Sequence, residues 1–390
     1  MQPRTSQSQS GQSRLHHLDW LRVLAVLLLI PFHTARIFDS FEPFYIKSQD
    51  TSELLTWGVI AFFNTWHMPL LFLIAGAGSY LALSVRSPGG FGRERALRLL
   101  VPFLFGVLVL VPPQAYVGAV TNAGFQGDYW SFLAGYFIPT GDLSGYFGTF
   151  TPGQLWFILF LLIYSFAALP LFVWARRPAN ADRVQYVTNV LTSRRLLWVP
   201  VLALWLSEAV PDLGGKNLIY FFLFFAAGAA YAASNIVRQR VERWWKWSAL
   251  VGIASTAVLM AVSIRSYPLA DWSAASVVVS LLRSINSWSI LVLMLGAAAA
   301  TLNRPGRLLS LANEGAYPFY LLHQTVIVLS GWWILSRPLG VDCRYVAICL
   351  ASLAGTILVY VGFVKPWNPV RWLFGMKHTR RGRSRCNDGR

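Results

Sequence analysis

Four titratable side chains lie in the first strongly apolar stretch of the sequence, at about residues 18–38: Asp19, Arg22, His33 and Arg36, of which the first three could do chemistry together. Eleven positions separate Arg22 from His33, or about three helical turns, so the two side chains are expected on one face, about 16 Å apart. Asp19 precedes Arg22 by three positions and joins that face. An imidazole exchanges protons near neutral pH, which makes His33 a candidate general base with Arg22 and Asp19 beside it.

Each of these residues also has a purely structural interpretation. Asp19 and Arg22 pair with each other and reach the membrane surface from the start of the helix. His33 is then a hydrogen-bonded core histidine. Ionisable side chains are costly inside a bilayer, however, and for His33 this favours a functional role.

Four further polar residues lie in or beside other apolar stretches and are candidates for substrate binding: His67, Glu208, Arg283 and His323. The alternative role of His67, Arg283 and His323 is to join neighbouring helices, because polar side chains hydrogen-bond across membrane helices. The alternative for Glu208 is that it is an ordinary residue of the membrane interface.

Three arginines precede the third apolar stretch: Arg93, Arg95 and Arg98. Guanidinium groups at a helix N-terminus bind phosphate through paired hydrogen bonds, aided by the helix dipole. The sequence therefore indicates a phosphate-binding site at these three arginines. The alternative is that these arginines only set membrane orientation, as basic loops do.

The elements that must position these residues are membrane-spanning helices. The chain has 390 residues, of which 55% are hydrophobic and only 13% charged, and its three cysteines cannot form a disulfide framework. This composition excludes an ordinary soluble enzyme and a disordered chain. It predicts an all-α, polytopic helix bundle with about ten spans of roughly 20 residues, at about 18–38, 54–83, 97–120, 155–176, 196–213, 217–235, 246–265, 274–301, 316–336 and 344–364.

The net charge of +17 is distributed unevenly along this pattern. Alternate connections carry most of the lysine and arginine, which predicts that both termini are cytoplasmic. The basic residues are then explained by topology and anionic lipid, and no nucleic-acid partner is expected. We expect a polar N-terminal tail at 1–14, a membrane domain at 15–365 and a basic C-terminal tail at 366–390. The first span acts as an uncleaved signal anchor, and no motif indicates a metal site.

Several motifs occur in an order that resembles the membrane-bound acyltransferase family 3. The first is Leu18-Asp19-Trp20-Leu21-Arg22 followed by His33, because an Arg or Lys, ten residues and a His mark that family's first span. The resemblance covers about residues 15–365 and includes the other motifs, which are Trp66-His67-Met68-Pro69, Arg93-Glu94-Arg95, Gln154-Leu155-Trp156-Phe157 and Tyr320-Leu321-Leu322-His323-Gln324.

This resemblance implies transfer of an acyl group, succinyl or acetyl, from cytoplasmic acyl-CoA to a hydroxyl of an envelope or periplasmic glycan. It implies a location in the bacterial inner membrane, with acyl-CoA as donor substrate and no permanently bound cofactor. The CoA phosphates would dock on Arg93, Arg95 and Arg98, and Trp156 would face the acceptor sugar. Relatives often have His where this chain has Gln154, so Gln154 is given no catalytic role.

Two other classes of function fit the same residues. A transporter or flippase of an envelope glycan or lipid would use the intramembrane charges as a substrate path, but it has no need of a CoA-phosphate site. A non-catalytic membrane subunit would tolerate loss of His33. Within the acyltransferase hypothesis, direct transfer and an acyl-histidine intermediate are both open.

Overall fold

The computed structural model describes residues 14–378 except 42, 139–140, 192–197 and 267–272. The described residues form helices and no strand, which confirms the all-α prediction.

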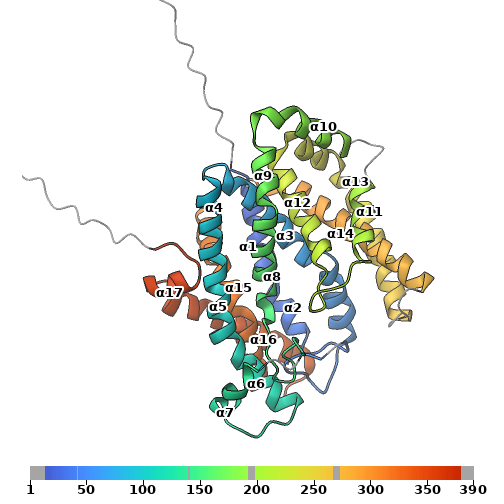
Figure 1. Ribbon diagram of the computed structural model, residues 1–390. Helices are drawn as coiled ribbons and strands as arrows, with labels where there is room; N and C mark the ends of the chain where they lie inside the picture. The colour runs from blue at the N-terminus through green and yellow to red at the C-terminus, as the bar shows by residue number, and fades with distance from the viewer. Residues whose placement is uncertain (1–13, 42, 139–140, 192–197, 267–272, 379–390) are drawn as a thin grey trace, which may run out of the picture.

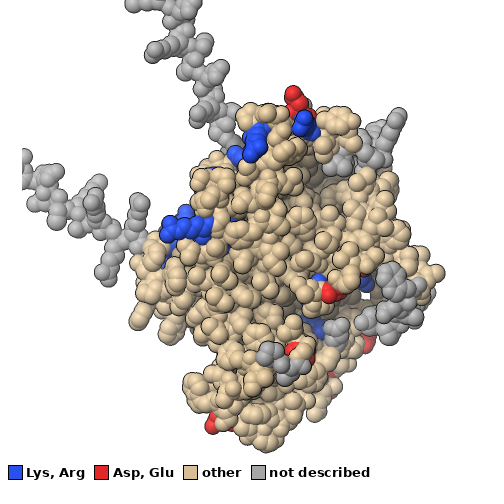
Figure 2. All heavy atoms as spheres, in the orientation of Figure 1, with Lys and Arg blue, Asp and Glu red and all other residues tan. Residues whose placement is uncertain are grey.

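The two ends of the bundle are recognised by the short helices that lie there (Figure 1). Helices α4 (Pro88–Arg95), α9 (Leu169–Ala175) and α10 (Ala181–Leu191) lie at one end. Helix α7 (Tyr129–Tyr136) and the end of α6 (Val111–Asn122) lie at the other. Lysine and arginine side chains gather toward the first of these ends (Figure 2), which we call the basic end; the second is the far end.

Six helical segments of the described chain are long and apolar enough to cross a membrane: His16–Ala35, Leu54–Leu83, Pro88–Asn122, Asn235–Ile264, Ala274–Thr301 and Val341–Val364. Two consecutive segments, Gly153–Ala167 and Leu169–Ala175, are bent by 44° and make a seventh if counted as one span. The protein is therefore a multi-pass helical membrane protein with six or seven such segments.

The remaining three predicted spans are helical but are too short or too polar to count as membrane-crossing segments. Helix α11 (Val199–Ser207) has only 9 residues, and α12 (Leu218–Ala233) has 16. Helix α15 (Arg307–Ile334) has 28 residues. It carries Asn313, Glu314, His323 and Gln324, and such polar residues lower its mean hydropathy. The structure thus does not confirm a count of ten.

The first span is interrupted where the sequence suggested one continuous helix. Helix α1 (His16–Leu27) and helix α2 (Leu29–Ala35) are separated at Leu28. The cause is Pro31, which has no N–H to donate and whose ring crowds the carbonyl of Leu27, four residues earlier. The interruption lies between Arg22 and His33, so their common face depends on the packing of α1 and α2 and not on helical spacing alone.

Helix α3 (Phe62–Leu83) crosses α12 with the two backbones in direct contact. A Cβ added to Gly76 would lie 1.8 Å from the carbonyl oxygen of Phe225, and one added to Gly228 would lie 1.8 Å from that of Leu73. Small residues permit this close approach between membrane helices. The paired glycines therefore fix how α3 and α12 cross.

Pro69 lies inside α3 and leaves one backbone carbonyl without its usual helical donor. That carbonyl belongs to Thr65, four residues before the proline. The hydroxyl of Ser287, on α14 (Ala274–Thr301), donates a hydrogen bond to it. The proline thus creates a polar link between two neighbouring helices instead of a vacant acceptor.

Both described ends of the chain lie at the basic end. His17 Nδ1, near the start of α1, lies 3.2 Å from Asn303 Oδ1, just before α15. Arg98 Nε donates a hydrogen bond of 3.0 Å to the carbonyl of Gly375. That this end faces the cytoplasm stays a prediction.

The first part of the expected C-terminal tail is a packed helix, α17 (Asn368–Leu373). Its Arg371 is buried and forms an ion pair of 3.1 Å with Glu314 of α15. Arg371 also donates hydrogen bonds to the carbonyls of Lys365 and Lys377. The predicted N-terminal tail at 1–14, except for residue 14, and residues 379–390 lie outside the described residues.

Candidate active site

His33 lies in the last turn of α2, in contact with aromatic side chains and a second histidine. Its ring stacks on that of Phe44 at 6.3 Å between centroids and lies 5.1 Å from the ring of His323. The side chain is half-buried. Its Nδ1 is buried and has no hydrogen-bond partner among the described residues. A buried ring nitrogen without a partner is energetically unfavourable, which suits a group that works on a bound substrate.

His323 is fully buried on α15. Its Nδ1 lies 2.6 Å from the carbonyl oxygen of Tyr320, while its Nε2 is buried without a partner in the described part of the chain. Arg22 Nη1 donates a hydrogen bond of 3.0 Å to Asn313, ten residues earlier on the same helix. Arg22 and His33 therefore both contact α15.

His67 has a different environment from the one expected of a substrate-binding residue. It is buried, and its Nε2 forms a hydrogen bond of 2.7 Å to the carbonyl of Ala25 on α1. The ring of Phe32 lies between His67 and His33, in contact with both. His67 lines neither of the two cavities described below, so its visible contribution is to join α3 to α1.

Arg22 belongs to a small polar network at the basic end. Its Nη1 forms an ion pair of 3.1 Å with Asp19, and Asn313 Nδ2 donates to the same carboxylate oxygen at 3.2 Å. Arg14 adds a second ion pair to Asp19. The network borders a cavity of about 420 Å³ that is also lined by Ile74, Gly78 and Leu81.

The arginine cluster does not stand at a helix N-terminus, which corrects the sequence interpretation. The helix begins at Pro88, capped by the Ser87 side chain. Arg93 and Arg95 therefore lie beyond the first turn, where backbone N–H groups are already paired. Any phosphate site here depends on the guanidinium groups themselves.

Within this cluster, Glu94 forms an ion pair with Arg98 but not with Arg93 or Arg95. Its carboxylate forms ion pairs with Arg86 and with Arg98, the latter at 3.2 Å. Arg93 is exposed, and no ion pair or hydrogen bond joins its side chain to another described residue. Arg95 packs its guanidinium over the ring of Phe91 at 5.1 Å.

A larger cavity of about 590 Å³ brings together three of the predicted residues: Trp156, Glu208 and Arg283. We call it the far-end cavity, because Arg36, which follows α2, also lines it. Ser284 Oγ donates a hydrogen bond of 3.4 Å to Glu208. Lys216 Nζ lies 5.6 Å from the centroid of the Trp156 ring. The lining mixes aromatic rings, amides and both signs of charge, and it includes Asn64, Trp57, Tyr220, Asn217, Asp212 and Arg36.

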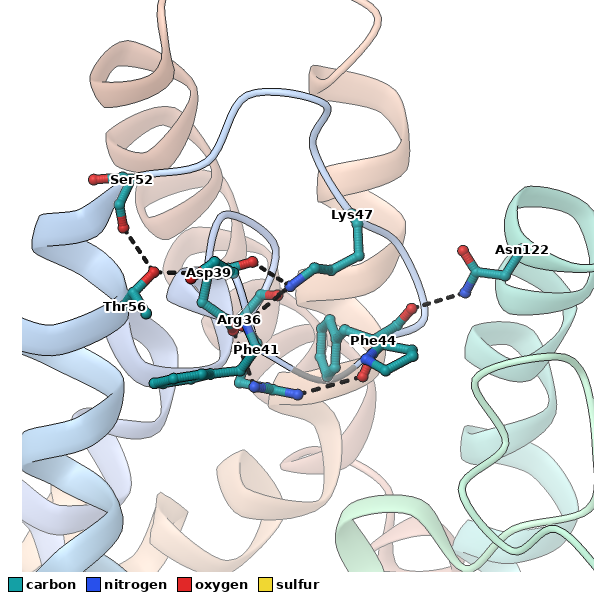
Figure 3. A network of polar contacts seen from close by, with 10 residues as sticks. Arg36, Asp39, Phe41, Phe44, Lys47, Ser52, Thr56 and Asn122 are labelled. Carbon is teal, nitrogen blue, oxygen red and sulfur yellow. Dashed lines mark hydrogen bonds and ion pairs between the residues drawn. The ribbon is translucent and has the colours of Figure 1, made fainter. Parts of the chain in front are cut away.

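The loop that follows α2 is held in place by a buried carboxylate that sequence reasoning missed (Figure 3). Asp39 is fully buried and forms ion pairs of 3.1 Å with both Arg36 and Lys47. The backbone N–H of Phe41 donates to the same carboxylate at 2.8 Å. Burial lowers the pKa of the Lys47 ammonium, and the Asp39 charge acts in the opposite direction.

The same loop places Phe44 against the catalytic candidate. Asn122 Nδ2, at the end of α6, donates a hydrogen bond of 2.8 Å to the carbonyl of Phe44. Arg36 packs its guanidinium over the Phe44 ring at 5.9 Å. The ring is buried and stacks on His33. An acidic residue three positions after Arg36 was the available sequence signal for this network.

No group of three or more residues suited to holding a metal ion occurs in the part of the chain that the structure describes. The fold and the site thus define a multi-pass membrane protein with a half-buried histidine, a basic-end cavity beside Arg22 and a far-end cavity beside Trp156. Residues 15–361 match the family model of an acyltransferase domain, acyltransferase 3. The chain therefore belongs to this acyltransferase family.

Relatives with curated names agree with that assignment. Glucans biosynthesis protein C of Salmonella paratyphi B is 28% identical over 232 residues, and so is the protein of that name from Salmonella dublin. The matched region covers 55% of this chain and 58% of those relatives, so the chain spans little more than half of their length. No solved structure matches the chain.

Proposed function

We propose that this protein is a membrane O-acyltransferase. It moves a succinyl or acetyl group from acyl-CoA, bound at the basic end, to a hydroxyl of an envelope glycan, bound at the far end. One observation carries the proposal: Arg22, which lines the basic-end cavity, and His33 both contact α15, so the cavity and the histidine border the same helix. Membership in the acyltransferase family supports it, and so does the name of the glucan-biosynthesis relatives.

The donor docks where guanidinium groups meet the basic-end cavity. Arg93 is open to solvent, and Arg95 lies within electrostatic reach of both Arg98 and Arg22. These cations suit the phosphates of CoA, because arginine pairs with phosphate oxygens in a two-pronged geometry. The pantetheine arm then follows the cavity beside Arg22 and Gly78 toward His33.

The acceptor occupies the far-end cavity. Trp156 and other aromatic side chains offer flat faces to the apolar side of a sugar ring, while Glu208 and Arg283 offer hydrogen bonds to hydroxyls. Two cations that line this cavity, Arg36 and Lys216, act electrostatically on His33.

His33 acts as general base in the transfer. A ring nitrogen takes the proton of the acceptor hydroxyl while the oxygen attacks the thioester carbonyl. The carbon–sulfur bond breaks, and the proton passes to the leaving thiolate. The products are a glycan ester and CoA with a free thiol, and no redox partner is required.

The donor site is tested by replacing both Arg93 and Arg95 with alanine in the purified protein. CoA affinity, measured by calorimetry, is expected to fall by about tenfold for each guanidinium removed. Binding to the unaltered protein is expected to weaken as salt is raised, because exposed charges are screened.

The matched control replaces Arg240 and Arg243, two arginines of α13 (Asn235–Ser266), by alanine. This variant loses the same charge and is expected to bind CoA normally. Unchanged CoA affinity after loss of Arg93 and Arg95 would place the donor site elsewhere.

A further inference from the structure

His33 and His323 each present a buried nitrogen without a partner, and their rings are neighbours. The atoms are Nδ1 of His33 and Nε2 of His323. The ring centroids are 5.1 Å apart, and the ring planes are inclined by 46°. At this separation a small ring rotation brings one nitrogen within hydrogen-bonding distance of the other. Two adjacent unsatisfied atoms of this kind indicate a bond that forms in the reacting state.

The proton position on His323 is fixed by its backbone contact. Its Nδ1 lies 2.6 Å from the carbonyl oxygen of Tyr320. A carbonyl oxygen only accepts hydrogen bonds, so Nδ1 carries the proton. In a neutral imidazole the other nitrogen is then an acceptor. His323 therefore offers a lone pair on Nε2 toward His33.

The ring of His323 is held in place by buried amides from two other segments. Tyr320 OH donates to the carbonyl of Gln154, and Gln154 Nε2 donates to the carbonyl of Leu321 at 3.1 Å. Gln114 Nε2, on α6, donates to Gln154 Oε1 at 2.8 Å. These bonds fix the turn of α15 that carries His323, so the direction of its lone pair is fixed as well.

We propose that His323 is a positioning residue for His33. Its Nε2 accepts a hydrogen bond from the Nδ1–H of His33, which keeps the other nitrogen of His33 unprotonated and ready to take the acceptor's proton. This proposal rests on the proposed function, in which His33 is the general base. In this role His323 acts through its contact with His33 and not on the donor or the acceptor.

Two substitutions separate this role from simple packing. His323→Gln places an amide oxygen close to the position of Nε2 and so keeps an acceptor for His33. His323→Asn keeps a donor near the position of Nδ1 but removes that acceptor. We expect His323→Asn to lower kcat by about tenfold to a hundredfold, as loss of a supporting hydrogen bond does at comparable sites. KM for acyl-CoA is expected to stay unchanged, and His323→Gln to recover a large part of kcat.

The assay uses purified protein with succinyl-CoA or acetyl-CoA and a glucan oligosaccharide, and it follows release of the CoA thiol. Equal kcat for the two variants, or full kcat in His323→Asn, overturns the positioning role. If His33→Ala were inactive at the same time, only this inference would fail. If His33→Ala were fully active, the proposed function itself would fail.

A second measurement reads the unaltered chain and does not depend on whether the His323 variants fold. Nitrogen-15 NMR of histidine-labelled protein, with His33→Ala to assign the signal, reports which nitrogen of His33 carries the proton. With acetyl-CoA bound we expect the proton on Nδ1. A proton on Nε2 in that state would overturn the proposal.

Discussion

Two carboxylates make the arginines of the first span tolerable inside the bundle. Asp19 pairs with Arg22 at the basic end, and Asp39 pairs with Arg36 at the far end. An ion pair buried in this way contributes little by itself, but removing one partner leaves an uncompensated charge and is strongly destabilising. Asp39 has two cationic partners and full burial, so the loop that carries Phe44 depends on it more than on any surface ion pair.

Replacing Asp39 by asparagine keeps its size and removes its charge. We expect the free energy of unfolding to fall by about 3 kcal/mol and turnover to fall as well, because Phe44 loses its fixed position against His33. Thermal unfolding in detergent and CoA release measure the two effects.

Asp50→Asn is the control within the same loop. Asp50 is 65% exposed and pairs with Arg344 at 3.4 Å, so a change below about 1 kcal/mol is expected. Equal effects of the two substitutions would contradict the role given to Asp39.

At the level of helices, the close crossing of α3 and α12 is the feature most sensitive to a single atom. Gly76→Ala directs a methyl group at the backbone carbonyl of Phe225, which lies 1.8 Å from the new atom. Neither backbone can move without displacing the other, so we expect a loss of about 1–3 kcal/mol. The measurement is the thermal unfolding midpoint in detergent, followed by tryptophan fluorescence.

Gly362→Ala provides the comparison for that experiment. A Cβ at Gly362 meets no atom within 4 Å, and the same substitution there is expected to leave the midpoint nearly unchanged. A Gly76→Ala protein as stable as Gly362→Ala would show that the helices do not pack as described.

The sequence predicted the helices better than their ends and breaks. Apolar stretches locate the helices, because a helix that crosses the bilayer needs a sufficiently long run of apolar residues. The sequence prediction did not include the break at Leu28, which Pro31 causes. It also placed the start of the arginine-bearing helix too late, because that helix begins at Pro88 after the Ser87 cap. Helix α15 was counted as an apolar span although its polar residues face the first span.

The polar contacts of the site were only partly predictable. The ion pair between Arg22 and Asp19 could be predicted from their helical spacing. The partnership of Arg22 with Asn313 joins residues 291 positions apart, and no local pattern in one sequence indicates such a contact. The same holds for the adjacency of His33 and His323, which depends on how α2 and α15 pack.

For the whole molecule, the orientation of the bundle decides which substrate reaches which cavity. The structure places both described chain ends and the arginine cluster at the basic end, and the proposed reaction requires that end to face the cytoplasm. Cys343 is exposed near the start of α16 (Val341–Val359), which begins at the far end. It is therefore a natural reporter of orientation.

In spheroplasts, a membrane-impermeant maleimide is expected to label Cys343 in a Cys386→Ser background. A cysteine introduced at Gly89, at the start of α4, is expected to react only after the membrane is opened. The reverse pattern would show that the basic end faces outward, and acyl-CoA could then not reach the arginines from the cytoplasm.

The proposed acyl transfer joins the two ends of the bundle and uses His33 as general base. Its most direct test uses proteoliposomes with labelled acyl-CoA outside, a glucan oligosaccharide inside, and detection of the esterified glucan by mass spectrometry. We predict ester formation by the unaltered protein and by His16→Ala, and a loss of at least about a hundredfold in His33→Ala. Full ester formation by a folded His33→Ala protein would contradict the account.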